Sequence, residues 1–377
     1  MSTVSTSTGS QIVKVGFVGC GGIVQGAHAP SLAQLPNVKL VACADVDKAR
    51  VAEFLEKYKL NFYTDYKEML TKETPDAVII ATPNALHAPV AIDALESGAH
   101  VLTEKPMAIS VDEAVKMVET ARRRQRVLMV GHHMRFERSI QVGRKFVTNG
   151  RLGKIYHIRA LHLRRRGIPS TVTFLQRKYS GGGPMWDIGV HTIDATMFMT
   201  NFPRPVSVVG KVYSAFSDKA YMRMNYPVPV TSQFAYTAPM DVEDFAMGLI
   251  KFEGDLTMYI EATWATYIKE DKHEVAIIGT EGGVHYEGGS LSYIHSIDEE
   301  FITSTPLIGQ QQSAYAQEDR AFIDAIVKGA VKAPYPACTG EQGVLDVAII
   351  ETIYKSAESG REEAVNIPKS IIDSMGW

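Results

Sequence analysis

The sequence predicts an α/β fold in two parts: a doubly wound parallel sheet, followed by an α+β part with a large, mostly antiparallel, open-faced sheet. In the first third of the chain, short apolar runs alternate with helical patterns, which is typical of βαβ units. Beyond His132 the apolar runs are longer and alternate with period two, as in antiparallel strands with helices on one face. A chain of 377 residues, 45% of them hydrophobic, has enough material for two domains.

We expect three segments along the chain. Residues 1–10 are rich in serine and threonine and have neither a basic start nor an apolar run, so they predict a disordered tail and not a signal peptide. Residues 11–131 form the first domain, and residues 132–377 form the second. No stretch approaches the roughly 20 apolar residues that span a bilayer. The net charge of −3 gives no general attraction to nucleic acid.

The three cysteines, Cys20, Cys43 and Cys338, show neither metal-ligand nor redox spacing. This pattern suits a reducing compartment, so we expect a cytoplasmic protein with no bound metal. Of two arginine runs, the one at 122–124 ends an amphipathic helix, where cations favourably meet the helix dipole. The run at 164–166 follows an apolar strand and is either solvated or part of an anion-binding site.

The first turn of the chain has the pattern of a dinucleotide site. An apolar strand at 12–18 leads into Gly19-Cys20-Gly21-Gly22-Ile23-Val24, and a helical pattern follows to about residue 35. Gly19 suits the tight turn and Gly21 lets the backbone approach a pyrophosphate, while the start of the helix supplies partial positive charge. Val24 departs from the pattern, because it stands where a third glycine or alanine is usual.

Asp45 supplies the acid that such a site needs. It follows a second strand at 38–44 and is placed to accept hydrogen bonds from the adenosine ribose. A carboxylate at this position repels a 2′-phosphate and therefore favours NAD. Lys48 and Arg50, just beyond it, leave NADP open.

Two further polar turns mark the site of the first domain. We expect helices near 47–58, 66–70, 91–95 and 111–123, and strands near 61–63, 76–81, 100–103 and 127–130. The strand at 76–81 ends in Thr82-Pro83-Asn84, with His87 just beyond, and the next strand ends in Glu104-Lys105-Pro106. Ligands of open α/β sheets bind at the carboxyl ends of the strands. A lysine at that edge can reach both nicotinamide and substrate.

The second part is expected to form an antiparallel sheet with helices on one face. The expected strands lie near 154–163, 206–214, 243–252, 256–264 and 273–278, and the expected helices near 138–148, 317–328 and 341–359. The segment 217–240 is long, irregular and contains prolines and tyrosines. Such a loop suits a substrate lid or a subunit-contact arm.

A glycine-rich stretch, Ser180-Gly181-Gly182-Gly183-Pro184, leads into a helical pattern that carries Asp187, His191 and Asp194. Their spacing of i, i+4 and i+7 puts all three on one face of a regular helix. This face brings a potential base beside two carboxylates. The alternative is a polar stripe that faces solvent.

Together these motifs resemble those of the Gfo/Idh/MocA oxidoreductases, relatives of glucose–fructose oxidoreductase and inositol 2-dehydrogenase. The resemblance runs from residue 12 to about residue 368 and includes Gly131-His132-His133-Met134-Arg135-Phe136. The residues expected to hold the cofactor are Gly19, Gly21, Gly22, Ile23, Asp45, Thr82, Asn84, His87, Glu104, Lys105 and, by the resemblance alone, Arg165.

The resemblance also implies catalytic and substrate-binding residues. Lys105, Asp187 and His191 match the family's catalytic lysine, aspartate and histidine. Asp194 matches an aspartate that binds a polyol hydroxyl in some members. His133, Met134 and His162 stand at substrate-contacting positions, where Met134 replaces a frequent arginine.

The implied function is NAD(P)-dependent hydride transfer between nicotinamide and a secondary hydroxyl or ketone of a sugar, inositol or related polyol, in a homodimer or homotetramer. His191, with an ordinary pKa of about 6.5, suits a proton acceptor. Lys105 would stabilise the oxyanion, and whether it or His191 takes the proton first stays open. The alternatives are an NAD-dependent glycosidase that oxidises its substrate transiently and a non-catalytic sugar sensor. A metal hydrolase is disfavoured, because it would not need the dinucleotide half.

Overall fold

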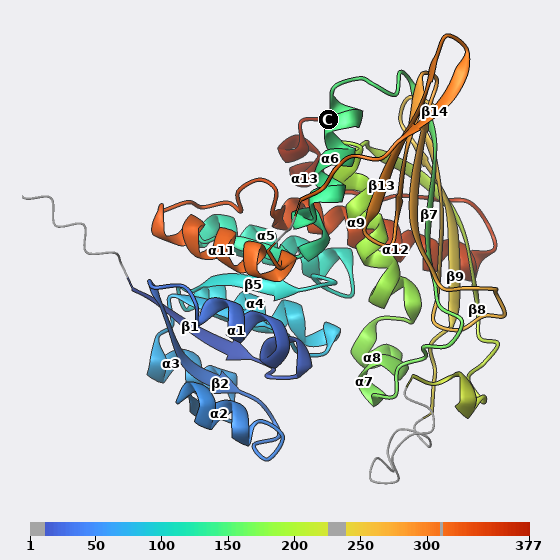
Figure 1. Cartoon of the computed structure of the whole chain (residues 1–377). Helices are drawn as coiled ribbons and strands as arrows, with labels where there is room; N and C mark the ends of the chain where they lie inside the picture. The colour runs from blue at the N-terminus through green and yellow to red at the C-terminus, as the bar shows by residue number, and fades with distance from the viewer. Residues whose placement is uncertain (1–11, 225–238, 310–311) are drawn as a thin grey trace, which may run out of the picture.

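The computed structural model describes residues 12–224, 239–309 and 312–377, which form two sheets with helices between and around them (Figure 1). The tail expected at 1–10 lies outside the described residues, and the loop expected at 217–240 is described only at its two ends. Among the helices of the described segments, none is long and apolar enough to cross a membrane.

The first sheet has seven strands in the order β15-β6-β5-β4-β1-β2-β3. They are β1 (Val13–Val18), β2 (Val38–Ala44), β3 (Asn61–Tyr63), β4 (Ala77–Ile80), β5 (His100–Glu104), β6 (Leu128–Gly131) and β15 (Cys338–Thr339). The first six pair in parallel, and β15 adds to the edge antiparallel to β6. The predicted doubly wound sheet is confirmed. Its strand order reverses between β1 and β4, the point where ligands of such sheets bind.

Helices of the first part alternate with these strands. They are the π-helix η1 (Val24–His28), α1 (Ala29–Leu32), α2 (Ala52–Tyr58), α3 (Tyr66–Glu73), the short η2 (Asn84–Leu86), α4 (His87–Glu96) and α5 (Val111–Arg124). Where the sequence predicted one helix after the glycine turn, the chain therefore forms a π-turn and then a short α-helix.

The second sheet has nine strands in the order β14-β13-β12-β11-β7-β10-β9-β8-β16. They are β7 (Ile155–Leu163), β8 (Pro205–Tyr213), β9 (Phe245–Phe252), β10 (Thr257–Thr263), β11 (Lys272–Gly279), β12 (Gly282–Glu287), β13 (Ser290–Ile297), β14 (Glu300–Ser304) and β16 (Glu363–Ala364). Only β7 and β10 pair in parallel among these described strands, so the mostly antiparallel sheet is confirmed.

Helices cover one face of this second sheet. The helices that contact its strands are α6 (Arg138–Thr148), the π-helix η4 (Met185–Gly189), α9 (Val190–Met199) and α12 (Gly340–Ser359). The other helices of this part are η3 (His133–Phe136), α7 (Val172–Leu175), α8 (Arg177–Ser180) and α13 (Lys369–Met375), while η5 (Ala220–Met222) lies in the loop after β8. In β10, Met258, Ile260 and Ala262 are fully buried, whereas the alternate residues Thr257, Tyr259 and Glu261 are only partly buried. The opposite face is open, and its neighbouring side chains Val209 and Leu249 are exposed.

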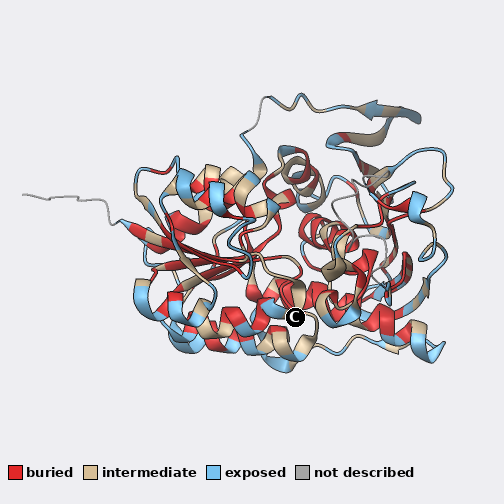
Figure 2. Ribbon diagram, turned by 90° about the horizontal axis from the view of Figure 1, so that it is seen from below, coloured by how far each residue is buried: buried red, intermediate tan, exposed pale blue. Residues whose placement is uncertain are grey.

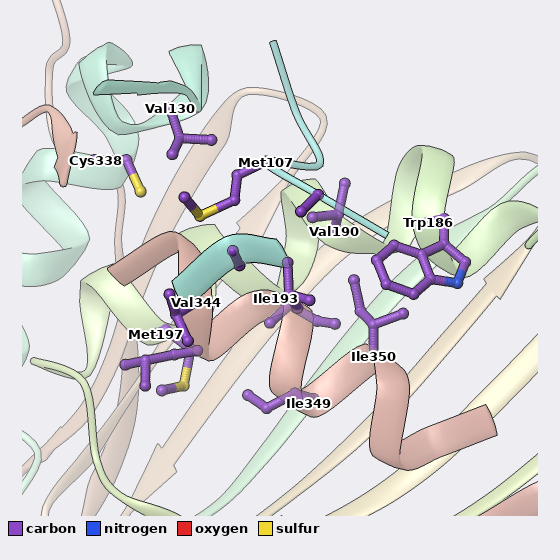
Figure 3. Close-up of a cluster of buried hydrophobic side chains, with 14 of the residues drawn as sticks. Met107, Val130, Trp186, Val190, Ile193, Met197, Cys338, Val344, Ile349 and Ile350 are labelled. Atoms are coloured by element: carbon purple, nitrogen blue, oxygen red, sulfur yellow. The ribbon is translucent and has the colours of Figure 1, made fainter. Parts of the chain in front are cut away.

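The cores of the two sheets meet in one buried cluster (Figure 3). Ile193 of α9 and Val344 of α12 pack there with Val130 of β6 and with Met107, which follows β5. A Cβ on Gly343 would lie 2.8 Å from Met107 Sδ, so α12 approaches the first sheet as closely as a glycine allows. Figure 2 shows buried residues concentrated in the strands of the first sheet and in the helices between the sheets. The two sheets are therefore joined by a continuous apolar core.

A late part of the chain returns to the first sheet. Helix α11 (Ala314–Val327) buries Phe322 and Ile323 in one cluster with Phe17 of β1, and β15 follows it. The domain boundary at residue 131 stays a prediction, because part of the second segment packs on the first sheet.

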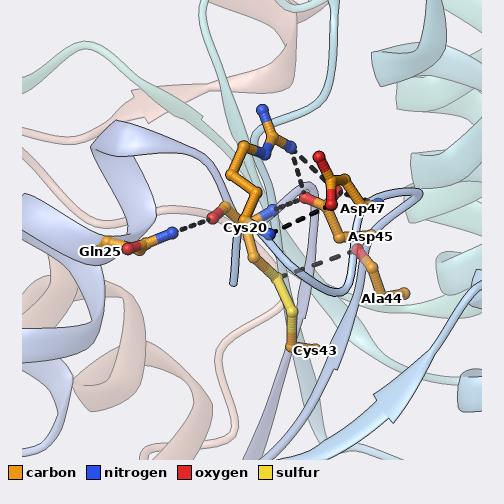
Figure 4. Close-up of a disulfide and its surroundings, with 7 residues drawn as sticks. Cys20, Gln25, Cys43, Ala44, Asp45 and Asp47 are labelled. Atoms are coloured by element: carbon orange, nitrogen blue, oxygen red, sulfur yellow. Dashed lines mark hydrogen bonds and ion pairs between the residues drawn. A yellow bond between two sulfur atoms is a disulfide. The ribbon is translucent and has the colours of Figure 1, made fainter. Parts of the chain in front are cut away.

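A disulfide joins Cys20 to Cys43, at the carboxyl ends of β1 and β2 (Figure 4). The spacing of 23 residues resembles no motif, so the sequence did not predict this pair. The pairing follows from the fold, because parallel neighbours bring the two Cα atoms within 6.5 Å. Cys338 is a free, buried cysteine.

Candidate active site

A cavity of about 640 Å³ opens at the carboxyl ends of β2, β1, β4 and β5. It runs from Asp45 and Arg50 at one end to Lys105 and His191 at the other. Three strand spacings of about 4.8 Å give a length of about 14 Å, which suits an extended ligand of two linked nucleotides. Most of the predicted cofactor residues lie in its wall: Gly19, Gly21, Gly22, Ile23, Asp45, Thr82, Asn84, His87, Glu104 and Lys105.

The glycine turn has room for a ligand. Gly19 has a φ of +79°, and a Cβ there would lie 2.6 Å from Ala81 O, so only glycine fits this turn. A Cβ on Gly21 or Gly22 would meet no described atom within 4 Å. These two glycines therefore leave open space above the start of η1 where a pyrophosphate can approach the backbone, and the residues present fit a dinucleotide.

The carboxylate of Asp45 is already engaged in hydrogen bonds (Figure 4). It accepts from the backbone N–H of Cys20 at 2.8 Å and of Asp47 at 3.0 Å. Arg50 Nη2 donates to both oxygens at 2.9 Å, although the Arg50 side chain is 55% exposed. This end of the cavity thus holds an acid with a partly exposed arginine over it.

The turn after β4 contacts two other segments. Asn84 Nδ2 donates to Ser180 O at 2.8 Å, which joins this turn to the glycine-rich stretch. His87 is buried, and its ring nitrogens lie 2.7 Å from Pro106 O and 2.9 Å from Thr82 O. Burial lowers the pKa of His87. A neutral ring donates to only one of these two carbonyl oxygens and packs beside the other.

Lys105 meets Asp187 where the two sheets face each other. Lys105 Nζ donates to Asp187 O at 2.8 Å and lies 3.3 Å from Asp187 Oδ1. The second oxygen, Oδ2, accepts from Trp264 Nε1 at 2.9 Å. The π-helix η4 carries Asp187, and such turns often occur at functional sites. Both side chains of the pair are therefore fixed, and they are only 16% and 14% exposed.

Histidines surround this pair. The ring centroid of His191 lies 5.2 Å from that of His133, and His162 stacks on His273 at 4.3 Å. Burial, then the charge of Lys105, holds the pKa of His191 well below its ordinary value. Burial likewise lowers the pKa of His133 to about 4 and that of His162 to about 2. These rings are neutral at pH 7.

Three of these rings have an Nδ1 atom without a hydrogen-bond partner among the described residues. These atoms, in His133, His162 and His191, are buried. Buried polar atoms are normally satisfied by protein, water or ligand. His191 lies in the wall of the cavity.

Three predicted site residues lie elsewhere. Asp194 is fully buried, and Arg135 Nε donates to its two oxygens at 3.0 and 2.9 Å. Met134 is buried in the apolar cluster that joins the two sheets, and Arg165 is exposed with its backbone N–H bonded to Asp271. The spacing placed Asp194 beside Asp187 on the assumption of a regular α-helix, but the π-turn at 185–189 shifts the register between them.

Asp194 belongs to a buried polar cluster with His132, Cys338 and Asp346, whose ligand atoms lie within 4.8 Å of one another. The His132 ring lies between the two carboxylates, with Nδ1 3.6 Å from Asp194 and Nε2 3.4 Å from Asp346. Arg135 supplies the positive charge beside Asp194. Burial lowers the pKa of His132 to about 4, and burial, then the charge of Asp194, raises the pKa of Asp346, so within this buried cluster Arg135 and Asp194 form the ion pair.

Sequence reasoning missed the residues behind Glu104. His28 of η1 is buried, with Nε2 3.1 Å from Glu104 Oε1 and Nδ1 2.7 Å from Asp319 Oδ1. Burial alone would lower the pKa of His28, but the two carboxylates outweigh it and raise this pKa well above its ordinary value. Burial would raise the pKa of Glu104, but His28 lowers it to about 2. Tyr315, stacked on His133, was also missed, and no local motif marks these residues.

The fold and the site define the class of protein. A doubly wound sheet with a glycine turn, an acid after its second strand and a lysine at the end of its fifth is the architecture of a dinucleotide-dependent oxidoreductase. The chain belongs to the Gfo/Idh/MocA oxidoreductase family. The family's NAD-binding Rossmann-fold model matches residues 13–132, and the model of its C-terminal domain matches residues 140–285. The resemblance predicted from the motifs is confirmed.

Curated relatives and solved structures agree with this family. The chain is 30% identical over 357 residues to D-glucoside 3-dehydrogenase of Escherichia coli (strain K12), an alignment that covers 93% of this chain and 97% of the relative. It is 34% identical over 164 residues to an alpha-N-acetylgalactosaminidase of Shewanella oneidensis, covering 41% of this chain and 35% of that protein. The structure of levoglucosan dehydrogenase in complex with NADH shares the fold, with a TM-score of 0.80, 22% identity and coverage of 95% and 100%.

Proposed function

We propose that the protein is an NAD-dependent sugar dehydrogenase that oxidises a secondary hydroxyl, at position 3 of a glucoside. The observation that carries this proposal is the contact of Lys105 with Asp187 beside His191, at the end of the cavity away from Asp45. The full-length similarity to a D-glucoside 3-dehydrogenase supports the substrate class.

Gly21, Gly22 and Asp45 would hold the cofactor, with Asn84 and Glu104 farther along the cavity. When bound, nicotinamide supplies the hydride acceptor at the end near Lys105. The glycine turn would bind the pyrophosphate through backbone N–H groups at the start of η1. Asp45 would accept hydrogen bonds from the ribose in place of those that Arg50 now donates.

Lys105, Asp187 and His191 would do the proton chemistry. A hydride leaves an alkoxide more readily than an alcohol, so a group must take the hydroxyl proton as the hydride departs. The neutral ring of His191 can accept it, although its low pKa makes it a weak base until negative charge develops nearby. The ammonium of Lys105 stabilises the developing oxyanion, and Asp187 fixes the direction of that ammonium. His133, beside His191, and His162, near Lys105, would bind further hydroxyl groups of the substrate.

The test is a panel of glucosides, free sugars, anhydrosugars and inositols with NAD or NADP. We expect reduced nicotinamide to accumulate with a glucoside and NAD, and NMR to show a ketone at carbon 3 of the product. No turnover with any member of the panel would disprove the proposal. The partial similarity to a glycosidase makes transient oxidation the second candidate. Glycoside cleavage without accumulation of reduced nicotinamide would show that case.

Asp45→Asn should shift the enzyme from NAD towards NADP. The change removes the charge that repels a 2′-phosphate. It also frees Arg50, which in the wild type donates hydrogen bonds to both Asp45 oxygens. Hydrogen bonds to charged groups contribute about 1.5–3 kcal/mol, so we expect the ratio of kcat/KM for NADP over NAD to rise roughly 10–100-fold. The control is Asp47→Asn, two residues along the same loop. An unchanged ratio in Asp45→Asn would contradict the assigned role.

The assembly and the location of the protein remain proposals. Val209, Tyr213 and Leu249 are exposed on the open face of the second sheet, which supports a homodimer or homotetramer formed through that face. Light scattering at working concentration tests this, and a monomer would contradict it. The cytoplasmic location predicted from the sequence stays a prediction.

A further inference from the structure

Two buried residues that have no role in the proposed chemistry contact the glycine-rich stretch. Glu243 lies just before β9 and is 3% exposed, and Tyr354 lies on α12. Glu243 Oε1 accepts a hydrogen bond from the backbone N–H of Gly183 at 2.8 Å and another from the Tyr354 hydroxyl. The start of β9 and helix α12 thus both contact the loop.

The loop passes too close to these residues for any side chain. A Cβ on Gly183 would lie 2.0 Å from Glu243 O, and one on Gly182 would lie 2.7 Å from the Tyr354 hydroxyl. Real Cβ contacts do not come this close, so the glycines are required by the approach to Glu243 and Tyr354.

The same loop connects the two halves of the site. At its start, Ser180 O accepts from Asn84 Nδ2 in the cofactor-binding turn. Two residues after Gly183 the π-helix η4 begins, and its Asp187 holds Lys105. The Gly183 contact therefore lies between the cofactor turn and the Lys105–Asp187 pair, where a small displacement would separate Asp187 from Lys105.

We propose that Glu243, together with Tyr354, is a positioning residue: by holding Gly183 it sets the place of Asp187 and hence the alignment of Lys105. This inference rests on the proposed function for its effect on turnover. The contact of Glu243 with Gly183, by contrast, can be measured without substrate. Displacements of about 1 Å from reacting geometry can cost 10²-fold in rate.

The hydrogen bond between Glu243 and Gly183 should change in strength with pH near neutrality. Burial raises the pKa of Glu243 to about 7, although the hydrogen bonds from Tyr354 and Gly183 oppose the shift. Oε2 is buried and has no hydrogen-bond partner among the described residues. The charged and titratable groups facing the carboxyl are Arg177 of α8 and Tyr354, whose own pKa burial and Glu243 raise. Ionisation makes the bonds to Gly183 and Tyr354 charge-assisted but leaves Oε2 unsolvated.

The test compares Glu243→Ala, Glu243→Gln and Tyr354→Phe with the wild type. Glutamine keeps an acceptor oxygen for Gly183 N–H but does not titrate. The control is Tyr259→Phe, which removes a similar hydroxyl-to-carboxylate bond, Tyr259 to Glu261, elsewhere on the second sheet. The measurements are amide hydrogen exchange in the segment 180–189, the affinity for NAD, and kcat and KM across pH.

We expect Glu243→Ala to speed exchange at Gly183 and to lower kcat roughly 10–100-fold, with the affinity for NAD kept. Glu243→Gln should show exchange at Gly183 and kcat close to those of the wild type. Its profile of kcat against pH should lack the step with an apparent pKa near 7. Tyr354→Phe should fall between them, and Tyr259→Phe should match the wild type. Equal exchange at Gly183 in all variants, or equal kcat in Glu243→Ala and the wild type, would overturn the proposal.

Stability gives a second readout. The folded protein keeps the Glu243 proton up to about pH 7, whereas the unfolded chain releases it near the ordinary value of 4.5. The free energy of unfolding of the wild type should therefore fall as pH rises between those two values, because the folded protein keeps the proton and the unfolded chain does not. In Glu243→Gln, which does not titrate, this fall should be smaller. If the wild type oxidises no sugar, the proposed function fails, but exchange and stability still decide whether Glu243 holds the loop.

Discussion

Lys105→Met is expected to lower kcat by roughly 10²–10⁴-fold and to leave the affinity for NAD nearly unchanged. The Lys105 side chain is 16% exposed, and its ammonium donates to the backbone oxygen of Asp187 at 2.8 Å. In such a poorly solvated place a fixed cation stabilises an oxyanion more than it would in water. Methionine has similar length and volume but no charge, so it removes the electrostatic contribution and keeps the packing.

The measurement is steady-state kinetics with the best sugar of the panel, together with fluorescence titration of NAD. Lys39→Met is the matched control, because Lys39 is exposed near the start of β2, away from the carboxyl ends of the strands. We expect it to keep wild-type kcat and KM. Wild-type turnover in Lys105→Met would remove this lysine from the mechanism.

The fold, and the gathering of the expected cofactor residues in one cavity, could be predicted because their signals are local. Gly19, Asp45 and Lys105 each follow directly on an apolar strand, and parallel strands bring their carboxyl ends to one edge. The sequence therefore needed no long-range information to place these residues in one cavity. The same holds for the change of period that marks the second sheet.

The rest depends on contacts between distant segments. His28 meets Asp319 across 291 residues, and Glu243 meets Tyr354 across 111 residues, and no spacing rule connects either pair. The prediction for Asp194 had a different fault. The periodicity of the segment shows that a helix is present, but it does not reveal the π-turn that ends before Val190. A regular helix would have kept Asp187 and Asp194 on one face, and the π-turn does not.

Arg135→Met is expected to destabilise the fold by about 3–5 kcal/mol, because it leaves a buried carboxylate without its partner. Arg135 is 1% exposed and bonds both oxygens of Asp194, which lies on α9 three residues after His191. Burial would raise the pKa of Asp194, but Arg135 outweighs it and lowers this pKa. The wild type thus keeps the contribution of this pair above the ordinary pKa of an aspartate and loses it as pH falls through the folded value.

In the variant, Asp194 takes up a proton, so the difference in stability between wild type and variant should grow as pH rises from about 4 to 7. Urea denaturation at several pH values measures it. Arg144→Met is the matched control: Arg144 also lies over the Phe198 ring but is only half-buried, so its loss should cost about 1 kcal/mol or less. Equal stability of the two variants would contradict the proposed contribution of the Arg135–Asp194 pair. The position of α9, and with it that of His191, would then depend on the apolar contacts of Ile193 and Met197.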